Sequence, residues 1–274
     1  MFQKIISRDN QKLKYARKVR DGKIKDVVYV EGRRHSGEVL RSNLTVHECF
    51  FVEGFKENTS GSELIKAISE TGVNISEVEN PIFQTIADTK TSQGIILIVE
   101  KPLTSKENFE VKFDEFKNNF PVVLFLSEIN NPANLGAILR TVEAVGANHV
   151  IISENSADAF SPKAGRSAMG ANLRLNIREN AGLPEVIIWA KEKNLVTTAA
   201  DVSAKNDYTQ IDWNIPRLLF FGSEAHGLSG DVLEMIEQTI YIPMENAVES
   251  LNLAVSCGII LFEAKRQISN LVIS

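Results

Sequence analysis

The sequence has 274 residues, 43% hydrophobic and 24% charged, with a formal net charge of −5, which is typical of a globular protein with room for two domains. No apolar run reaches the roughly 18 residues of a membrane span, and the first residues lack the apolar core of a secretory signal, so we expect a cytoplasmic protein with no membrane partner. The two cysteines, Cys49 and Cys257, are too few for a disulfide framework, and no His, Cys, Asp and Glu set has metal-ligand spacing, so we expect no metal.

The charge is distributed unevenly along the chain. Residues 1–41 carry twelve Lys and Arg against five acids, whereas the remainder carries eighteen basic and thirty acidic residues. This basic arm has two interpretations: an electrostatic footprint for a polyanion such as RNA, or the solvated face of an amphipathic helix. The charge alone does not distinguish between them.

The first hundred residues alternate between strand-like and helix-like patterns. The pattern predicts strands at 27–30, 46–52, 73–78 and 94–99, and helices at 33–41, at 62–69 and from about residue 81. Ser62 is a candidate N-cap for the second of these helices. Together with the basic arm, these elements predict a small α/β domain over residues 1–105. Residues 106–120 are charged and show little apolar periodicity until their end, so we interpret them as a linker.

Strands also alternate with helices from residue 121 to the end. The pattern predicts strands at 121–126, 149–152, 195–200, 217–221 and 240–242, and helices ending near residue 145 and at 184–193 and 253–269. A loop is expected over 161–177. This alternation predicts a second α/β domain over residues 121–274, with a mostly parallel sheet covered on both faces.

Three polar, glycine-containing segments follow strands in this second domain. They are Asn131–Thr141 (NPANLGAILRT), Phe220–Ser229 (FFGSEAHGLS) and Ile242–Val255 (IPMENAVESLNLAV). The carboxyl ends of parallel strands meet at one edge of a sheet, which is where ligands bind in open α/β folds. We therefore expect one site assembled from three distant parts of the sequence.

In the first segment, Asn134 and Arg140 stand apart from the apolar helix face that contains Ile138 and Val142. Asn134 is either the N-cap of this helix or a site residue. Arg140 is either a surface arginine or a side chain directed at a phosphate or ribose, because it lies one to two turns beyond the end of a strand.

The second segment lacks the Lys-Ser/Thr of a P-loop and the glycine spacing of a dinucleotide turn, which disfavours a Rossmann-type nucleotide enzyme. Its glycines are interpreted as bringing backbone amides close to a flat, largely neutral ligand. Glu224 either caps a helix or aligns a polar substrate group, and His226 is either a base or structural. In the third segment, Ser250 and Asn252 precede the final helix; only one of them can be its N-cap, which leaves the other free for a second role.

In this order and spacing, the segments resemble the signature motifs of the SpoU (TrmH-type) RNA ribose 2′-O-methyltransferases of the SPOUT superfamily. The matching residues are Asn134, Gly136 and Arg140; Gly222, Ser223, Glu224, Gly227 and Leu228; and Ile242, Pro243, Met244, Ser250, Leu251 and Asn252. A further Arg-Ser-x-x-Gly segment of the family is matched by Arg166, Ser167 and Gly170. The first domain resembles the small substrate-binding domain that precedes many members. Asn246 stands where the family usually has glycine, and Ser256 and Cys257 stand where it usually has alanine.

The resemblance implies a cofactor, a knotted fold and a dimer. The cofactor is S-adenosylmethionine, the C-terminal SPOUT domain carries a trefoil knot, and a homodimer completes the site across its interface. The implied cofactor-binding residues are Gly222, Ser223, Glu224, Gly227, Ile242, Met244, Leu251 and Leu253. The implied catalytic residues, which position the hydroxyl or the neighbouring phosphate, are Arg140, Asn134, Glu224, Ser250 and Asn252.

The implied partner is RNA. A 23S ribosomal RNA is the first choice of substrate, because an appended substrate-binding domain is more usual in those enzymes than in the transfer-RNA enzymes. A transfer-RNA 2′-O-methyltransferase and a non-catalytic RNA-binding or ribosome-associated protein remain as alternatives.

Overall fold

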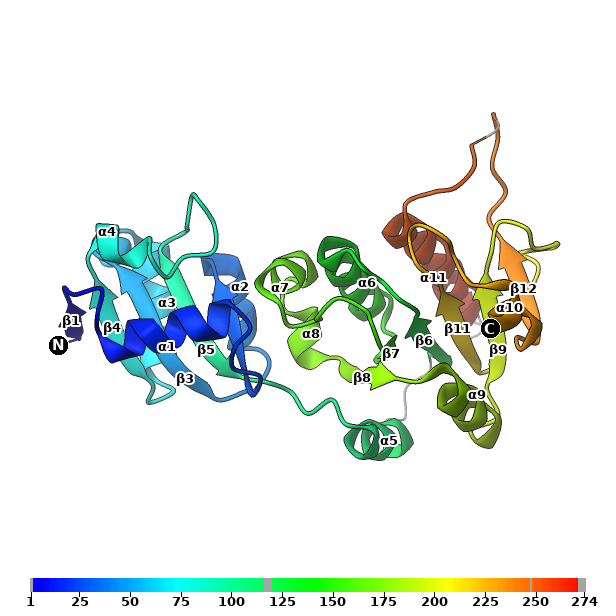
Figure 1. Cartoon of the computed structure of the whole chain (residues 1–274), viewed down its shortest axis with the longest axis horizontal. Coiled ribbons are helices and arrows are strands. Elements are labelled where there is room, and N and C mark those ends of the chain that lie inside the picture. Colours follow the sequence, from blue (N-terminus) through cyan, green and yellow to red (C-terminus); the bar gives the residue numbers. More distant parts are fainter. Residues whose placement is uncertain (1, 116–119, 247, 271–274) are drawn as a thin grey trace. The chain divides into compact units, whose positions relative to one another are not determined.

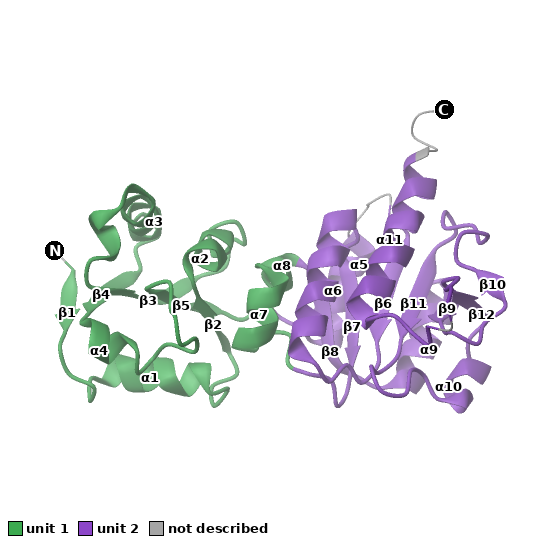
Figure 2. Cartoon of the chain, turned by 90° about the horizontal axis from the view of Figure 1, so that it is seen from above, with its two compact units in different colours: residues 1–102, 158–174 green, residues 103–157, 175–274 purple. Residues whose placement is uncertain are grey.

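The computed structural model (Figure 1) describes residues 2–115, 120–246 and 248–270. The chain forms two compact units (Figure 2). Unit 1 comprises Met1–Pro102 and Asp158–Arg174, and unit 2 comprises Leu103–Ala157 and Leu175–Ser274. Unit 1 therefore includes residues 158–174, which sequence analysis assigns to the second domain. Within the described ranges, no helix is both long and apolar enough to span a bilayer.

Unit 1 is built on a mixed five-stranded sheet in the order β1-β4-β3-β5-β2. Its strands are β1 (Gln3–Ile5), β2 (Val27–Glu31), β3 (Val46–Val52), β4 (Asn74–Val78) and β5 (Ile95–Glu100). β1, β4 and β3 are mutually parallel, whereas β5 runs antiparallel to both of its neighbours, β3 and β2. The continuous apolar run 95–99 is fully buried, as expected of a strand with both faces covered.

Helices cover both faces of this sheet. They are α1 (Gln11–Arg20), α2 (Arg33–Val39), the short 3₁₀ helix η1 (Phe55–Glu57), α3 (Thr59–Ser69), α4 (Asn80–Phe83), α7 (Pro162–Ala168) and α8 (Ala171–Arg174). α1 and α4 lie on one face, and α2 and α3 lie on the other (Figure 2). The predicted N-cap Ser62 is wrong: Asn58 caps α3, because its side-chain oxygen accepts the Gly61 N–H at 2.8 Å.

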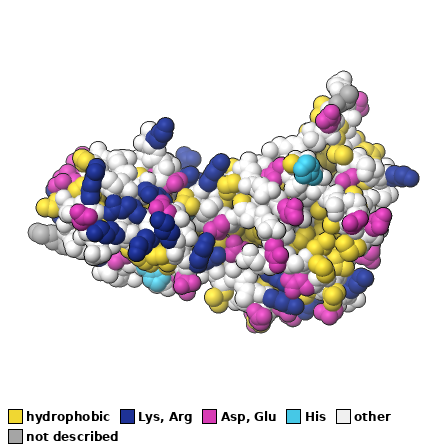
Figure 3. All heavy atoms as spheres, in the orientation of Figure 1, with side chains coloured by type: hydrophobic (Ala, Val, Ile, Leu, Met, Phe, Trp, Pro, Cys, Tyr) yellow, Lys and Arg dark blue, Asp and Glu magenta, His cyan; other side chains and the backbone are white. Residues whose placement is uncertain are grey.

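The basic arm contains the amphipathic helix α1. Leu13, Ala16 and Val19 are buried against the sheet, and Asn10 caps the helix by accepting the Lys12 N–H. Lys14 and Lys18 are exposed. Lys and Arg side chains gather on the surface over α1 (Figure 3). The helix interpretation is confirmed, and the outer face of that helix remains strongly basic.

Residues 158–174 belong to unit 1 because α7 and α8 pack closely against it. A Cβ atom on Gly170 would lie 2.6 Å from Glu38 Cβ, and the φ of Gly170 is +85°, so only glycine fits this contact. Two ion pairs add to the packing: Arg166 to Asp88 at 2.5 Å and Arg174 to Glu38 at 3.0 Å. The loop predicted over 161–177 is thus two short helices followed by the start of a strand.

Unit 2 contains a seven-stranded sheet in the order β10-β12-β9-β11-β6-β7-β8. The strands are β6 (Val122–Leu126), β7 (His149–Ser153), β8 (Asn176–Ala181), β9 (Val196–Ala200), β10 (Asn206–Asp207), β11 (Arg217–Phe221) and β12 (Gln238–Tyr241). All neighbouring strands are parallel, which confirms the predicted α/β class. β8 and β10 were not predicted, because one is polar (NIRENA) and the other has only two residues.

The helices of unit 2 are α5 (Lys106–Glu115), α6 (Pro132–Val145), α9 (Leu183–Glu192), α10 (Gly230–Glu234) and α11 (Leu253–Asn270). α5 occupies most of the predicted linker; residues 116–119 of that segment lie outside the described residues. α5 is anchored by Phe109, which is fully buried and packs edge-on against His149 and Trp189. The helix was missed because Phe109 and Phe113 are its main apolar contacts in an otherwise charged sequence.

Two buried histidines should make the folded protein sensitive to mild acid. Burial lowers the pKa of His35 and of His149 to about 4, and the charges of Arg166 and Arg174 add to the effect at His35. The unfolded chain binds these protons near pH 6.5, so their contribution to stability is complete above that pH and is lost as the pH falls toward about 4. We expect a loss of roughly 1–3 kcal/mol per histidine over this interval.

Urea denaturation at successive pH values measures this loss. His149→Gln should make the unfolding free energy depend less on pH, because the glutamine amide does not titrate. His47→Gln, the same substitution at an exposed position, is the control for the change of side chain. A wild-type slope in His149→Gln would contradict the assignment for His149.

Candidate active site

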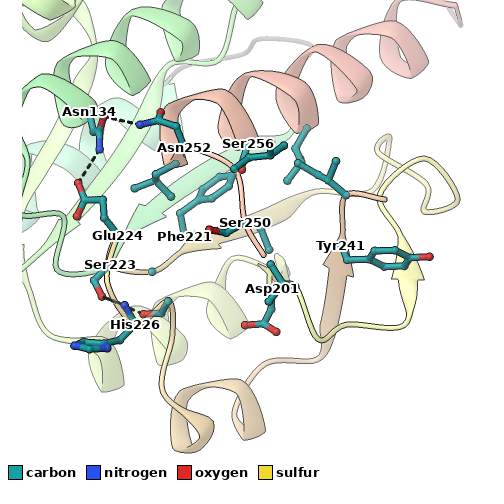
Figure 4. A pocket seen from close by; sticks show the side chains of 18 of the residues that line it. Asn134, Asp201, Phe221, Ser223, Glu224, His226, Tyr241, Ser250, Asn252 and Ser256 are labelled. Carbon is teal, nitrogen blue, oxygen red and sulfur yellow. Dashed lines mark hydrogen bonds between the residues drawn. The ribbon is translucent and has the colours of Figure 1, made fainter. Parts of the chain in front are cut away.

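A pocket in unit 2, with a volume of about 550 Å³, brings together parts of all three polar segments (Figure 4). Residues from these segments that line it are Asn134; Phe221, Gly222, Ser223, Glu224, Ala225, His226 and Gly227; and Ile242, Met244, Ser250, Leu251, Asn252 and Leu253. The segments meet because the parallel strands β6, β11 and β12 all end at one edge of the sheet. Thirteen residues were expected to be catalytic or cofactor-binding or were considered as a base; twelve of these line the pocket, and Arg140 does not.

The segment after β11 closes into a tight turn at the pocket. The Ser223 N–H donates to the Gly227 carbonyl at 3.1 Å, and the Gly227 N–H donates back to the Ser223 carbonyl at 2.9 Å. A Cβ atom on Gly222 would lie 2.1 Å from the carbonyl carbon of Gly227, a distance that no packing adjustment of a side chain can relieve. The glycine at 222 is thus required by the approach of one backbone segment to another.

A chain of hydrogen bonds joins the three segments (Figure 4). Asn134 Nδ2 donates to Glu224 Oε1 at 3.0 Å, and Asn252 Nδ2 donates to Asn134 Oδ1 at 3.2 Å. The Glu224 carboxylate also accepts the backbone N–H groups of Asn130 and Asn131, each at 3.2 Å. One carboxylate therefore fixes the start of α6 and, through Asn134, the start of α11.

Glu224 is held in its ionised form. Partial burial acts to raise the pKa of its carboxyl, but the hydrogen bonds from Asn134 and from the Asn130 and Asn131 backbone outweigh burial, so the pKa lies below its ordinary value. The N-terminus of α6 adds favourable positive potential. Such a carboxylate accepts hydrogen bonds and orients the amides around it.

The N-cap of α6 is a different residue from Asn134, which was one of the candidates for it. Asn131 is the N-cap, with its side-chain oxygen 2.9 Å from the Ala133 nitrogen, and Pro132 begins the helix. Asn134 lies within the first turn, so its amide is left to bridge Glu224 and Asn252. The interpretation of Asn134 as the cap is wrong.

Asn252 serves both as a cap and as a link between segments. Its Oδ1 accepts the Ala254 N–H at 3.0 Å while its Nδ2 reaches Asn134. Ser250 is exposed and lines the pocket, and no hydrogen bond reaches its hydroxyl from the described part of the chain. Ser250 is thus the residue of this pair that is left for a ligand.

His226 and Arg140 have different places relative to the pocket. His226 lines it with an exposed ring, and its backbone N–H donates to Ser223 Oγ at 3.3 Å. Arg140 is exposed on α6 and does not line the pocket. Arg140 is six positions after Asn134, which is a rotation of roughly 240° around the helix, so the two side chains leave α6 in different directions. Over residues 2–115, 120–246 and 248–270, Arg140 has no ion-pair or hydrogen-bond partner.

One wall of the pocket is formed by Ala200, Asp201 and Val202, which no sequence motif predicts. Ala200 is the last residue of β9, and Asp201 and Val202 follow it; β9 ends at the same edge of the sheet as β11. Their position at the end of a predicted strand was the one sequence feature that could have indicated a place in the site. They contain neither glycine nor a recognisable motif.

The pocket's lining suits a ligand with a flat apolar part and a polar part. Phe221, Ile240 and Leu251 supply apolar surface, whereas the backbone of 222–227 and the side chains of Ser250 and Asp201 supply polar groups. Its volume lies within the range typical of small-molecule sites. These features fit S-adenosylmethionine, with an adenine ring and a charged amino-acid end.

Metal-ligating side chains are not clustered in the described ranges, where no group of three or more His, Cys, Asp or Glu is arranged to hold a metal ion. Cys49 and Cys257 are both buried free thiols. Burial raises the pKa of Cys49 to about 12 and that of Cys257 further still, so both remain protonated at neutral pH.

Two family profiles cover most of the chain. The profile of the SpoU rRNA methylase family matches residues 121–262. The chain belongs to this family. A second profile, for RNA 2′-O ribose methyltransferase substrate binding, matches residues 29–104. The resemblance seen in the sequence is thereby confirmed, and the protein is an S-adenosylmethionine-dependent RNA 2′-O-methyltransferase.

Relatives of known sequence cover nearly the whole chain. The 23S rRNA (guanosine(2553)-2'-O)-methyltransferase RlmP of Bacillus subtilis is 27% identical, over 96% of this chain and 100% of its own length. The putative TrmH family tRNA/rRNA methyltransferase YacO of the same organism is 28% identical, over 87% of this chain and 95% of its own length.

Solved structures share the fold. A crystal structure of an RNA 2'-O ribose methyltransferase has a TM-score of 0.80 at 25% identity, covering 97% of this chain and 99% of its own. The SpoU methyltransferase AviRb from Streptomyces viridochromogenes, in complex with AdoMet, has a TM-score of 0.81 at 22% identity and covers 95% of this chain and 100% of its own. The predicted small N-terminal domain followed by a SPOUT domain is confirmed as the fold class.

Proposed function

We propose that this enzyme methylates the 2′-hydroxyl of one ribose in 23S ribosomal RNA. The hydrogen-bonded chain Glu224–Asn134–Asn252 carries the proposal, because it ties all three family segments around one pocket. The match to the 23S rRNA enzyme RlmP, over the full length of that relative, supports ribosomal RNA as the substrate.

Mapping of 2′-O-methyl groups tests the choice of substrate. Total RNA from cells that lack the gene should be missing one 2′-O-methyl group in 23S ribosomal RNA, and a plasmid copy of the gene should restore it. Loss of a methyl group from a transfer RNA instead would make the protein a transfer-RNA enzyme. A non-catalytic RNA-binding protein is distinguished by calorimetry, because S-adenosylmethionine titrated into it would give no binding heat.

In the proposed mechanism, residues 222–227 with Ile242, Met244, Leu251 and Leu253 hold the cofactor. When bound, S-adenosylmethionine supplies a methyl group activated by its positive sulfonium. Methyl transfer is an in-line displacement in which the ribose 2′-oxygen forms a bond to the methyl carbon. The carbon–sulfur bond breaks, its electron pair stays on the sulfur, which becomes neutral, and the hydroxyl proton passes to water. The protein must therefore orient the hydroxyl and provide a path for its proton.

The described side chains fit an orienting role. The Ser250 hydroxyl and the Asn134 and Asn252 amides can position the 2′-hydroxyl, and Glu224 keeps those amides in place. Arg140 would bind the phosphate beside the target ribose. We assign it no general-base role, because an arginine side chain is protonated at all physiological pH values.

Because Arg140 lies outside the pocket of its own chain, we propose a homodimer in which one protomer supplies Arg140 to the pocket of its partner. Exposed apolar side chains support an interface on α11, where Val255 is 50% and Phe262 is 53% exposed. α11 packs along α6, the helix that carries Arg140. Burial of such side chains is a common driving force for dimer formation.

We also propose that the C-terminal chain forms the trefoil knot of the family. Two observations support it. After β12, near one edge of the sheet, the chain returns so that α11 packs against α6. The loops 222–227 and 242–252 also line one pocket.

The basic face of α1 should contribute to RNA binding. Lys14→Glu combined with Lys18→Glu should lower the affinity for RNA by about tenfold or more and make it less dependent on salt, because contacts to phosphates release counterions. The affinity for S-adenosylmethionine should not change. Charge substitution is preferable to deletion of the first domain, since deletion would expose the faces of α7 and α8 that pack on it.

RNA binding measured at several salt concentrations tests this expectation. The control is Lys66→Glu combined with Lys191→Glu, which makes the same charge change at exposed positions on α3 and α9. Equal losses of affinity in the two double variants would show that net charge alone, and not the α1 surface, determines binding.

A further inference from the structure

A second cavity, in unit 1, has no part in the cofactor pocket. This groove has a volume of about 950 Å³, and it lies between the start of α2, η1 and the turn that precedes β5. Its lining residues are Arg33, Arg34, Val52, Glu53, Gly54, Phe55, Glu57, Ser60, Leu64, Ser92, Gln93 and Gly94. We propose that it binds one unpaired nucleotide of the RNA substrate, with the base stacked on the guanidinium of Arg33. This proposal rests on the proposed action on RNA.

The guanidinium of Arg33 is held in a fixed orientation. Its central carbon lies 4.6 Å from the centre of the Phe55 ring, and its Nη1 donates to Asn58 Oδ1 at 3.0 Å and to Ser60 Oγ at 3.3 Å. Phe55 is buried, so it provides a firm support beneath the guanidinium. The guanidinium carbon lies over the Phe55 ring, so in the proposal the base stacks on the guanidinium from the side away from that ring. A planar cation supported in this way is a favourable stacking surface for an RNA base.

Gln93 provides a hydrogen-bond donor beside this stacking surface. Its Oε1 accepts the Arg33 backbone N–H at 2.8 Å, which fixes the orientation of the amide. The Nε2 group then has two N–H donors and no hydrogen-bond partner in the described parts of the chain. A donor at a fixed place can recognise a carbonyl or ring nitrogen at the edge of a stacked base.

The loop that carries Gln93 is anchored by a buried carboxylate. Glu31 accepts the Asp88 N–H at 2.7 Å and the Thr89 hydroxyl at 2.5 Å. Burial acts to raise the pKa of Glu31, but the hydrogen bonds from Thr89, Ser92 and the Asp88 backbone outweigh it, so its pKa is below the ordinary value. At Gly94 the φ is +82°, and a Cβ atom would lie 2.7 Å from Val52 Cγ1, so the loop sits directly against β3. The groove is thus formed before RNA binds.

The charges of the groove favour a single inserted base over a run of phosphates. Arg34 is exposed and forms no ion pair with any described residue, which makes it available to a phosphate. Two carboxylates also line the groove, Glu57 and Glu53, and Glu53 pairs with Lys4 at 2.9 Å. These carboxylates would repel a continuous backbone. Bases within a duplex are stacked and cannot enter such a groove, so the expected ligand is a nucleotide in a loop or bulge.

The experiment compares the affinity of the full-length protein for two RNAs, without cofactor. One is a hairpin with an unpaired loop of mixed sequence, and the other is a blunt duplex with the same stem. Arg33→Ala should weaken hairpin binding by about tenfold while changing duplex binding by less than about twofold. Arg33→Lys should lose nearly as much, because it keeps the charge but not the planar stacking surface. Gln93→Ala should weaken only hairpin binding.

Wild-type hairpin affinity in Arg33→Lys would overturn the proposal, because it would show that charge alone matters. An equal loss for hairpin and duplex would also overturn it. Thermal denaturation and S-adenosylmethionine titration of each variant check that the fold and the cofactor pocket are intact. Failure of the proposed function would appear separately, as absence of methyl transfer to RNA by the wild-type enzyme.

Discussion

Replacing Arg140 with alanine should abolish methyl transfer while leaving the affinity for S-adenosylmethionine within about twofold of the wild-type value. Arg140 lies outside the pocket that the cofactor would occupy, so its removal takes no contact from the cofactor. In the proposed mechanism the lost contact would be the one to the phosphate beside the target ribose, and without it the 2′-hydroxyl would not be aligned. Loss of a charged positioning group of this kind lowers kcat by on the order of a thousandfold.

Single-turnover methylation and calorimetric titration together measure these two effects. Lys191→Ala is the control, because Lys191 is an exposed cation of unit 2 that lies on α9, outside both the pocket and α11, and this variant should retain normal turnover. Near-normal turnover in Arg140→Ala would rule out its assignment. A matching loss of cofactor affinity would instead place Arg140 at the cofactor.

A mixed dimer tests whether Arg140 acts across an interface. One subunit carries Arg140→Ala and the other carries Gly222→Ala, which should prevent cofactor binding. If Arg140 serves the partner's pocket, one working site forms in each mixed dimer, made of the first subunit's pocket and the second subunit's arginine. If Arg140 serves its own pocket, the mixed dimer has no working site and stays inactive.

Gly222→Ala should reduce the affinity for S-adenosylmethionine by more than about a hundredfold. The added methyl group would lie 2.1 Å from the Gly227 carbonyl carbon and 2.4 Å from the Leu228 nitrogen. These are backbone atoms of the turn that lines the pocket, so the turn must open to accept the change. Overlap with backbone cannot be relieved by a change of rotamer, and the cofactor would lose the amides that the turn presents.

Gly230→Ala is the matched control. Gly230 starts α10, and a Cβ atom there has no other heavy atom within 4 Å, so this variant should bind the cofactor normally. Calorimetric titration gives both affinities, and circular dichroism shows whether the fold is retained. Wild-type cofactor affinity in Gly222→Ala would mean that the cofactor does not depend on this turn.

Much of unit 2 follows from local sequence. Buried parallel strands such as 122–126 and 217–221 are nearly uniform apolar runs, and this pattern predicts both the strands and their common edge. The convergence of the three segments follows from that edge. The roles of the individual residues in these segments do not follow from local sequence. Asn130, Asn131 and Asn134 are all plausible caps of α6, and only the position of Glu224 separates the backbone donors Asn130 and Asn131 from the side-chain donor Asn134.

The errors arise where long-range contacts outweigh local pattern. Residues 162–168 and 171–174 show weak periodicity, yet they are helical, and Arg166 and Arg174 pair there with Asp88 and Glu38 from the first hundred residues. α5 depends on Phe109 being buried against His149 and Trp189. A pattern read along the chain contains no information about such partners.

The central claim is that the enzyme transfers a methyl group from S-adenosylmethionine to a ribose 2′-oxygen. It is tested most directly by methylating RNA from cells that lack the gene with radiolabelled S-adenosylmethionine, followed by alkaline hydrolysis. Alkali cleaves RNA through the free 2′-hydroxyl, so a 2′-O-methyl group protects the neighbouring bond. We predict that the label is recovered in an alkali-resistant dinucleotide and disappears with Arg140→Ala. Label recovered in mononucleotides would place the methyl group on a base and would contradict the account.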